Sequence, residues 1–407
     1  MAAPKILAVV SSMDLRFRYG CTPAWWQLWK GLYEAGAELI VTPYRGRALE
    51  APWWRTYENP CYREGEAYAL ARQAAARLRG EAHLRRAEDA PPDTASDRLA
   101  RQAIWRWVTP RWRKHLERIL SRESGVDAVI VFTVPMSHVR GIPAFLRERF
   151  SVPVVYYDGD VPMSLPEFGG MDTGFNIYHG ADPSEYDLVL SNSEGGRTRL
   201  LELGARQAET LFWGADPELF SPLPVAKERD VFFYGYGDKF RAEWIDKLIA
   251  EPSRRLPDVN FVLGGGDFRS DTGRAREIGP VPFNAFRRAI SASRINLNIT
   301  RRPHATTYAS STSRPFELAA AGAAIVSNPH AGMERWFEPG QEVLIASTSE
   351  AAADAYRDLL ADPAAAEDMG RRARARALDE HTYVQRARRL LELIGLASPT
   401  KRSAAHA

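Results

Sequence analysis

The stretch Asn296-Leu297-Asn298-Ile299-Thr300 and the later run Ser313-Arg314-Pro315-Phe316-Glu317-Leu318-Ala319-Ala320-Ala321-Gly322 predict a strand, a loop and a helix in this 407-residue chain. The first stretch has the compact apolar character of a buried strand. Pro315 falls in the expected first turn of the helix, where a proline removes no hydrogen bond. Because a second compact strand follows Gly322, at 324–327, this unit predicts a parallel β-sheet with helical connections.

The same alternation extends in both directions from this unit. Compact apolar runs separated by helical patterns lie at 5–11, 38–42, 127–132, 152–157, 186–191, 230–234, 260–263, 294–299, 324–327 and 343–346. The run at 5–11 is too short for a signal peptide and is expected to be a buried strand. Turn-rich residues 213–222 divide the chain.

The sequence therefore predicts two α/β domains, at 1–212 and 213–382, and helices inserted into the first at about 60–125. A last amphipathic helix is expected at 383–396. The small, polar residues of 397–407 predict a disordered tail.

The charge balance limits the possible partners. The 54 Lys and Arg residues nearly offset the 51 Asp and Glu residues, which leaves a formal net charge of +3. A general nucleic-acid-binding protein would present a dominant basic face, so that class is disfavoured. The two cysteines, Cys21 and Cys61, have neither metal-site nor disulfide-framework spacing, which favours reduced thiols in a cytoplasmic protein.

Membrane association has one candidate segment. No apolar run in the sequence approaches the ~20 residues that span a bilayer. Residues 101–114 mix tryptophans with cations, as a helix at a membrane surface does. The alternative is a helix whose tryptophans pack inward, which is the commoner arrangement of aromatic side chains.

Two glycine-rich loops follow strands of the predicted second domain, where open α/β sheets bind ligands. The loop 263–267 has three glycines, and an ordinary connection explains it better. The loop 234–241 opens a helix and can hold a diphosphate through backbone NH groups and cations, although a plain strand-to-helix turn is the alternative. Its candidate donor-binding residues are Gly235, Tyr236, Gly237, Lys239 and Arg241.

The loop between the strand and helix quoted first supplies further candidates for binding a phosphorylated ligand. Its hydroxyl side chains precede a helix N-terminus, where backbone NH groups favour anions. Glu317 can accept both hydroxyls of a ribose, although a carboxylate at this place can also simply complement the helix dipole. The candidate residues are Asn298, Thr300, Ser310, Ser311, Thr312, Ser313, Arg314 and Glu317.

The run 313–323, followed by Glu334, Phe337-Glu338-Pro339-Gly340 and Glu342, resembles the C-terminal half of the group 1 glycosyltransferases. The Ser-Arg-x-Phe-Glu helix start and the segments 370–373 and 380–383 are most similar to the spore-maturation-protein subgroup. Residues 213–220 resemble the turn between the two domains of that family. The specific part of the resemblance covers about 210–395, and the N-terminal half is less similar.

The resemblance implies the GT-B fold, in which two Rossmann-like domains face each other across a cleft and a C-terminal helix crosses back to the first domain. It also implies a nucleoside-diphosphate sugar, most often a UDP-sugar, on the second domain, with Glu317 on its ribose. The family's other glutamate falls near Ala309 in this sequence, so it is missing. Tyr308, Ser310 or Ser311 can contact the sugar instead, and the stereochemical outcome stays open.

The sequence Asp158-Gly159-Asp160 follows a strand of the predicted first domain. Asp158, and secondly Asp160, is a candidate general base for an acceptor hydroxyl, although both carboxylates can instead cap the next turn. His179 and His304 are further candidates for proton transfer or phosphate binding. The loop after the first strand is expected to line the cleft on the acceptor side through Arg18, Tyr19 and Gly20.

Together with the resemblance, these features predict a hexosyl- or N-acetylhexosaminyltransferase that needs neither a metal nor a cofactor beyond its nucleotide-sugar substrate. The donor half contains no Asp-x-Asp of the metal-binding type. The expected partners are the donor and an unidentified acceptor. A sugar-nucleotide epimerase of the same fold is one alternative, and a non-catalytic nucleotide-sugar-binding protein, which the missing glutamate favours, is another.

Overall fold

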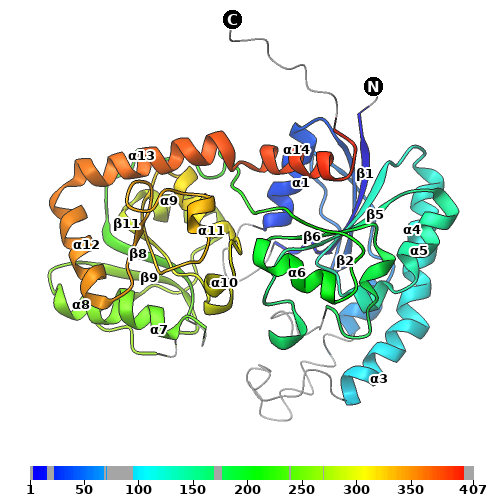
Figure 1. Ribbon diagram of the computed structural model, residues 1–407, viewed down its shortest axis with the longest axis horizontal. Coiled ribbons are helices and arrows are strands. Elements are labelled where there is room, and N and C mark those ends of the chain that lie inside the picture. The colour runs from blue at the N-terminus through cyan, green and yellow to red at the C-terminus, as the bar shows by residue number, and fades with distance from the viewer. Residues whose placement is uncertain are drawn as a thin grey trace, which may run out of the picture.

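The computed structural model describes residues 3–15, 23–67, 70, 95–168, 177–237, 240–268 and 270–397. These residues form two lobes, each built on a parallel β-sheet (Figure 1). The first domain carries the sheet β3-β2-β1-β4-β5-β6-β7, and the second domain carries the sheet β10-β9-β8-β11-β12-β13. The prediction of an α/β protein with two parallel sheets is therefore confirmed.

The central strands of both sheets are buried, near-continuous apolar runs, as in sheets that helices cover on both faces, whereas the short edge strands are more exposed. All five residues of β4, for example, are buried. The first sheet consists of β1 (Lys5–Ser12), β2 (Glu38–Arg45), β3 (Arg55–Thr56), β4 (Ala128–Phe132), β5 (Val154–Asp158), β6 (Leu188–Ser191) and β7 (Ala208–Thr210). The second consists of β8 (Arg229–Tyr236), β9 (Phe261–Gly266), β10 (Arg276–Glu277), β11 (Ser293–Asn298), β12 (Ala324–Ser327) and β13 (Leu344–Ile345).

Helices connect the parallel strands and cover the sheets. Those of the first domain are α1 (Ala24–Glu34), α3 (Ala95–Ala103), α4 (Thr109–Arg122), α5 (Ile142–Phe150) and α6 (Glu194–Glu202). Those of the second are α7 (Ala242–Ile245), α8 (Glu251–Arg255), α9 (Phe283–Ser291), α10 (Arg302–Thr306), α11 (Ser313–Ala320), α12 (Ser349–Ala361) and α13 (Pro363–Glu380).

The last helix, α14 (Tyr383–Leu393), crosses back from the second domain and packs on α1 of the first (Figure 1). A capping box between Thr382 and Gln385 fixes its start. The two helix backbones come so close that a Cβ atom at Gly31 would lie 2.5 Å from the Tyr383 carbonyl oxygen. Glycine is required there because any side chain would push the crossover helix away.

Residues 213–216 connect the two domains and contact both. The Trp213 ring lies 5.3 Å from that of Tyr157 in the first sheet. Ala215 forms a parallel bridge with Thr382, next to the crossover helix. Arg386 Nε, on that helix, donates to the Trp213 carbonyl oxygen at 2.9 Å. The turn that the sequence places between the domains is therefore anchored at both sides.

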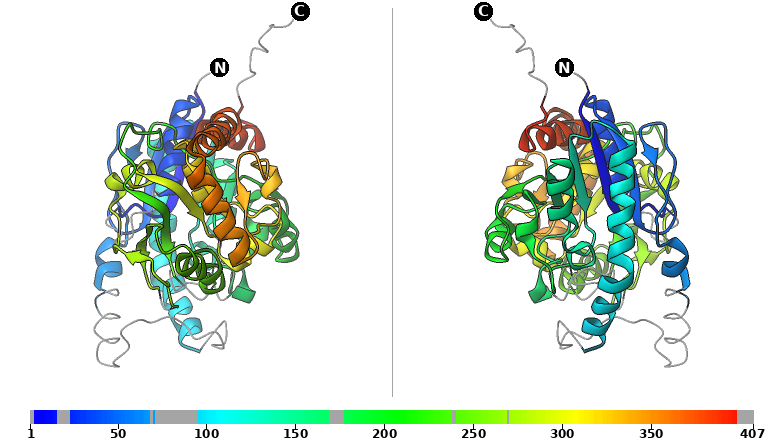
Figure 2. Two further views of the ribbon diagram at one scale, coloured as in Figure 1. Left: turned by 90° about the vertical axis from the view of Figure 1, so that its left-hand side faces the viewer. Right: turned by 90° about the vertical axis from the view of Figure 1, so that its right-hand side faces the viewer.

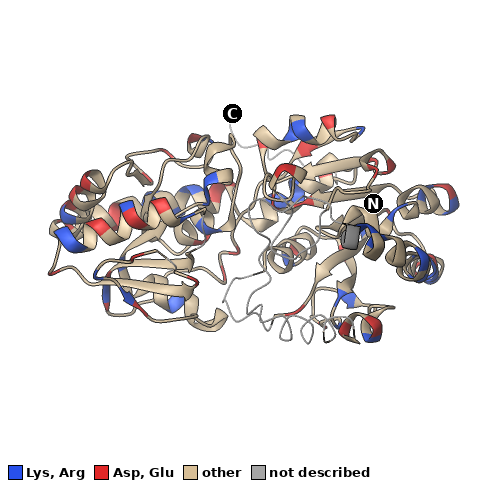
Figure 3. Cartoon of the chain, turned by 90° about the horizontal axis from the view of Figure 1, so that it is seen from below, with Lys and Arg blue, Asp and Glu red and all other residues tan. Residues whose placement is uncertain are grey.

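The inserted residues 95–122 form an almost continuous helical segment, in which the π-turn Ile104–Val108 joins α3 to α4 (Figure 2). The sequence left open whether its tryptophans pack inward or are exposed, and the structure contains both kinds. Trp112 is fully buried, whereas Trp107 is 61% exposed. Across both domains, basic and acidic side chains are interspersed (Figure 3). Within the described ranges, no helix is both long enough and apolar enough to cross a bilayer.

The order of the strands defines where a ligand is expected. After β3 the chain returns to the other side of β1 to form β4, and after β10 it returns to the other side of β8 to form β11. Open α/β sheets bind ligands at such switch points, outside the carboxyl ends of the strands. In this chain the ends of β5, β8 and β11, with the loops that follow them, carry most of the predicted site residues.

Candidate functional site

An ionic cluster joins the carboxyl end of β5 in the first domain to the loop after β11 in the second. Arg301 Nη2 donates to Asp160 Oδ1 at 2.9 Å. His304 Nε2 lies 3.1 Å from the same oxygen. Burial raises the pKa of Asp160, but Arg301 and His304 outweigh that effect and hold it below its usual value. Asp160 therefore carries a negative charge at neutral pH, and 18% of its side chain is exposed.

His304 connects this cluster to a serine. The ring is almost fully buried, and burial lowers its pKa below the usual value. Its Nδ1 atom lies 2.8 Å from Ser310 Oγ. Ser310 Oγ in turn donates to the carbonyl oxygen of Val161, in the first domain, at 2.7 Å. One imidazole thus contacts groups that are held by both domains.

Asp158 occupies a different environment from Asp160. It is the last residue of β5 and is 0% exposed. Its carboxylate accepts hydrogen bonds from Ser164 Oγ at 2.6 Å, from Tyr178 OH at 2.5 Å and from the Asp160 backbone NH at 3.1 Å. Burial raises the pKa of Asp158 to about 6 against these bonds. These hydrogen bonds indicate that Asp158 holds the 158–164 loop in place. His179, which follows Tyr178, is half-buried.

Replacing Asp158 by asparagine tests this environment. Because burial raises the pKa from 3.8 to about 6, the folded protein keeps a proton that the unfolded chain loses between these pH values. Ionisation of Asp158 therefore lowers the free energy of unfolding as the pH rises through this window, by on the order of 3 kcal/mol. We expect the stability of Asp158→Asn relative to wild type to increase from about pH 4 to pH 6 and then to stay constant.

Urea unfolding at a series of pH values measures this difference. Buried histidines such as His330 and His381, whose pKa values burial lowers to about 4, titrate in an overlapping range. Only the difference between variant and wild type is therefore informative. Asp354→Asn, on the exposed surface of α12, serves as the matched control. A difference that does not change with pH would contradict the buried, protonatable state of Asp158.

Main-chain hydrogen bonds also join the domains, along what we call the seam, formed by residues 192–195 and 307–311. Ser193 and Ser310 form an antiparallel bridge, and Gly195 N donates to the Tyr308 carbonyl oxygen at 2.9 Å. Ser311 Oγ donates to the Asn192 carbonyl oxygen at 2.8 Å. The hydroxyls of Ser310 and Ser311 are fully buried and bonded to protein in this conformation.

The seam also explains why position 309 is an alanine, where the family that the sequence resembles carries a glutamate. Ala309 is fully buried and has a φ of 44°, in the left-handed region. A Cβ atom at Gly332 would lie 2.4 Å from the Ala309 backbone nitrogen. Because the backbone is enclosed on this side, a glutamate at 309 would require the seam to rearrange. The alanine at 309, where the family that the sequence resembles carries a glutamate, is therefore part of the contact between the domains.

The glycine-rich loop after β8 has structural reasons for its composition. A Cβ atom at Gly235 would lie 2.7 Å from the Phe233 ring, and one at Gly237 would lie 2.6 Å from the Phe268 Cα atom. Close packing by these two phenylalanines therefore accounts for both glycines. Arg241 follows the loop and donates to the Ile299 carbonyl oxygen at 2.8 Å and to the Tyr236 carbonyl oxygen at 3.2 Å. These bonds hold its guanidinium near His304, whose pKa it helps to lower.

Polar side chains at the ends of β11 and β12 form a buried network below this cluster. Asn298 Nδ2 donates to Ser327 Oγ at 2.9 Å, and the Thr300 backbone NH donates to Asn328 Oδ1 at 2.8 Å. Asn298 and Thr300 are each at most 2% exposed, so they organise the strand ends that support Arg301.

His330 is a site residue that the sequence reasoning missed. It follows β12, is 7% exposed, and its ring packs edge-to-face on Trp336 at 5.2 Å. Neither ring nitrogen makes a hydrogen bond of ordinary geometry to the described residues, although the Ser310 backbone lies close by. Its position in the sequence could have indicated it, because His330 lies in the loop just after a buried parallel strand, and such loops form the ligand-binding edge of the sheet.

The quoted helix α11 turns its first residues toward the first domain. Glu317 is 3% exposed, and its Oε2 lies 3.1 Å from Arg314 Nη1. Burial raises the pKa of Glu317, and the neighbouring Arg314 and the side chain of Gln27 on α1 oppose this. The Arg314 guanidinium also stacks 4.3 Å from the Phe286 ring centroid. Ser313, beside the N-cap residue Thr312, reaches Tyr383 on the crossover helix.

Asp160, Arg241, Arg301 and His304 thus lie close together where the two domains meet. Glu317 lies beside Gln27 of α1, and Arg314 lies beside Glu317. In the described part of the chain, no group of three or more His, Cys, Asp or Glu side chains is arranged to hold a metal ion. Four predicted residues lie outside the described residues, namely Arg18, Tyr19, Gly20 and Lys239.

The second domain and the crossover helix are similar in sequence to known proteins. Residues 241–392 match a protein family described as glycosyl transferase-like. A curated relative, the GDP-mannose-dependent alpha-(1-6)-phosphatidylinositol monomannoside mannosyltransferase of Mycolicibacterium smegmatis, is 28% identical over 239 residues, which cover 52% of this chain and 63% of that protein. The match thus spans less than two thirds of the relative's own length.

Solved structures resemble the chain over almost its whole length. Sucrose-phosphate synthase from Thermosynechococcus elongatus superposes with a TM-score of 0.63 at 14% identity, covering 96% of this chain and 98% of that one. Anabaena Alr3699/HepE, solved in complex with UDP-glucose, gives 0.58 at 14% identity, covering 96% and 99%. At these identities the likeness concerns the fold alone. The two facing domains and the crossover helix are the GT-B fold.

Proposed function

We propose that this chain is a glycosyltransferase that moves a sugar from a nucleoside-diphosphate sugar to an acceptor hydroxyl without a metal ion. The donor would bind the second domain, which contains the glycosyl transferase-like region. The curated relative is named for GDP-mannose, and one solved structure contains UDP-glucose. A nucleoside diphosphate is common to both, and within this class we favour a UDP-sugar.

The observation that carries the proposal is the pair of arginines at the carboxyl edge of the second sheet. Arg241 and Arg301 both lie beside His304, and their positions are fixed by hydrogen bonds to the ends of β8 and β11 and to Asp160. A departing nucleoside diphosphate gains negative charge as the sugar–oxygen bond breaks. Preorganised guanidinium groups stabilise such a charge without further rearrangement.

For the acceptor we propose Asp160 as the proton acceptor and Asp158 as a positioning residue. The acceptor oxygen attacks the anomeric carbon, the bond from that carbon to the diphosphate oxygen breaks, and the hydroxyl proton passes to the carboxylate. Asp160 is ionised and partly exposed, whereas Asp158 is fully enclosed by its hydrogen-bond donors. Asp160 is thus the better candidate for contact with an acceptor.

Donor binding gives a direct test. We expect one of UDP-, GDP-, dTDP- and CDP-sugars to raise the melting temperature of the full chain, in the presence of EDTA as well as magnesium. Stabilisation follows the logarithm of the ligand concentration over its Kd, about 2.7 kcal/mol at a hundredfold excess. A protein that no nucleotide sugar stabilises, at any concentration up to the solubility limit, would contradict the proposal.

A non-catalytic nucleotide-sugar-binding protein is the second candidate, favoured by the buried Ala309 at the place of a family glutamate. The two functions are separated by following the bound donor over time. Release of nucleoside diphosphate, by transfer or by slow hydrolysis, supports the enzyme. Binding without any turnover supports the non-catalytic protein, and conversion of the donor to an epimer identifies the epimerase.

A further inference from the structure

A series of aromatic rings runs along α1 and crosses from one domain to the other. The Trp26 ring on the first turn of α1 lies 5.2 Å from Trp53 and 6.2 Å from Phe283, the first residue of α9 in the second domain. Tyr33 lies on the last turn of the same helix, on the wall of a pocket that Trp53 also lines. We call Phe283, Trp26, Trp53 and Tyr33 the aromatic strip.

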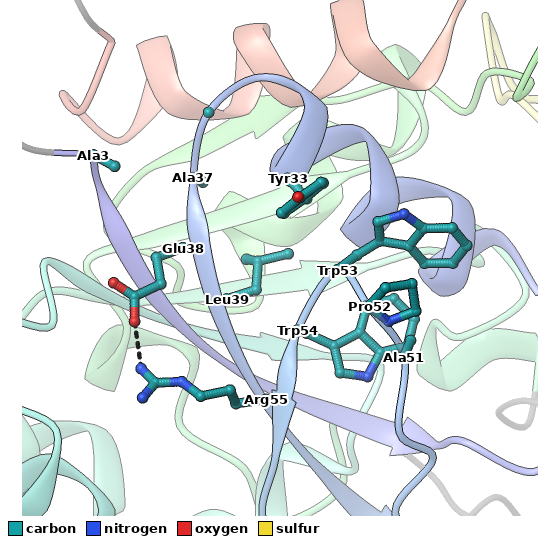
Figure 4. Close-up of a pocket in the computed structure, with 11 residues that line it drawn as sticks. Ala3, Tyr33, Ala37, Glu38, Leu39, Ala51, Pro52, Trp53, Trp54 and Arg55 are labelled. Atoms are coloured by element: carbon teal, nitrogen blue, oxygen red, sulfur yellow. Dashed lines mark hydrogen bonds and ion pairs between the residues drawn. The ribbon is translucent and has the colours of Figure 1, made fainter.

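The strip ends in an open pocket of about 630 Å³ at the amino ends of β1 and β2 (Figure 4). Its apolar wall includes Tyr33, Leu39 and Trp53, and its polar edge is the ion pair between Glu38 and Arg55. The side chains of this pair are 45% and 54% exposed, so they keep hydrogen-bonding capacity toward a ligand. The pocket lies at the opposite end of the strands from Asp160 and Arg301.

Packing leaves the two end rings of the strip partly open to solvent. Tyr33 is 49% exposed and Phe283 is 39% exposed, although both belong to helices that bury most of their other large apolar residues. A patch of exposed aromatic side chains with polar groups at its edge is the usual composition of a ligand-binding surface. None of the four rings of the strip takes part in the proposed transfer chemistry.

We propose that the aromatic strip and its pocket bind an oligosaccharide chain. A pyranose ring presents C–H groups on its faces, which pack on aromatic rings, and hydroxyls at its rim, which bond to groups such as Glu38 and Arg55. The Trp26 ring meets those of Trp53 and Phe283 edge-to-face, so these rings form one apolar surface, and Tyr33 adds to the wall of the adjoining pocket. A lipid chain fits less well because it offers no hydrogen-bonding groups to the exposed side chains of Glu38 and Arg55.

This inference rests on the proposed function, which it deepens by assigning the acceptor to the class of oligosaccharides. The strip begins where Trp26, on the first turn of α1, meets Phe283, on the first turn of α9, and it continues along α1 to Tyr33. The neighbouring residue Gln27 contacts Glu317, so this end of the strip lies beside the proposed donor site. A chain bound there would place one end toward the donor and the remaining units on the strip. Binding along several rings explains selectivity for a long acceptor over a single sugar.

Binding of neutral oligosaccharides tests the inference directly. The probes are six-unit chains of α-glucan, β-glucan, mannan and chitin type, followed by calorimetry and by tryptophan fluorescence of the full chain. We expect at least one probe to bind, and Tyr33→Ala and Trp53→Ala to weaken it about tenfold or more. Trp53→Phe should recover part of the affinity, and Trp107→Ala, which removes an exposed indole elsewhere, should leave it unchanged.

Other outcomes overturn the inference. These are the absence of binding to every probe, equal effects of Tyr33→Ala and Trp107→Ala, and binding of the strip to neutral lipid vesicles in place of sugars. Donor affinity, measured in the same variants by thermal shift, separates the two proposals. Wild-type protein that binds a nucleotide sugar but no oligosaccharide contradicts only the strip, and protein that binds no nucleotide sugar contradicts the proposed function.

Discussion

Replacing Arg301 by alanine is expected to lower kcat for sugar transfer by about 10³-fold while changing the donor KM much less. Arg301 lies between the carboxylate of Asp160 and the ring of His304, with 17% of its side chain exposed. The charge on a departing diphosphate grows as the bond to the sugar breaks, so a guanidinium aimed at it stabilises the transition state more than the bound donor.

Arg302→Ala is the matched control for this variant. Arg302 is the next residue, has the same charge, and is exposed at the start of α10. We expect its activity to stay within about twofold of wild type, since surface charges have small effects. Initial rates of nucleoside-diphosphate release, at several donor concentrations, give kcat and KM for each protein. Equal losses in the two variants would argue against a specific role for Arg301.

Arg301→Lys adds a second comparison. Lysine keeps the positive charge but lacks the planar fork through which arginine contacts two groups at once. We expect it to recover part of the kcat lost in Arg301→Ala. Melting temperatures of all three variants show whether the loss of contacts to Asp160 has destabilised the junction. A variant that melts like wild type but transfers sugar slowly locates the defect in catalysis.

The parallel sheets could be predicted because their strands carry the signal locally. Runs such as those of β4 and β12 are short, apolar and separated by helical patterns, which few other folds combine. The end of each strand was less predictable. The sequence places a strand at 152–157, whereas β5 covers Val154–Asp158, because pairing with its neighbours rather than composition sets the last residue.

The site was only partly predictable because several of its features are contacts between distant segments. A motif such as Gly235-Tyr236-Gly237 suggests a ligand, but the packing of Phe233 and Phe268, which accounts for the glycines, is visible only in the structure. Asp158 and Asp160 look alike in the sequence and differ in three dimensions, since hydroxyl donors enclose Asp158, whereas Arg301 and His304 contact Asp160. Burial of this kind depends on tertiary packing, which local patterns do not encode.

Replacing Glu317 by glutamine is expected to weaken donor binding by about tenfold to a hundredfold, the effect of losing hydrogen bonds to a charged group. Glutamine keeps the size of the side chain but loses the negative charge and one of the two acceptor oxygens, so it cannot accept a hydrogen bond from each ribose hydroxyl through a separate oxygen. In this conformation Glu317 contacts Arg314 and Gln27. A bound ribose would replace the contact with Gln27 and keep the charge of Arg314 alongside.

Because the ribose does not change during the reaction, this contact should be equally strong in the bound donor and in the transition state. The Glu317→Gln variant is therefore expected to raise KM and leave kcat nearly unchanged, the opposite of the Arg301→Ala result. Glu334→Gln, on the exposed turn after β12, is the control for loss of a carboxylate. Unchanged donor affinity in Glu317→Gln would remove this residue from the ribose. A fall in kcat at constant KM would instead place it near the reacting sugar, and the two kinetic constants thus distinguish the nucleoside end of the donor from its reactive end.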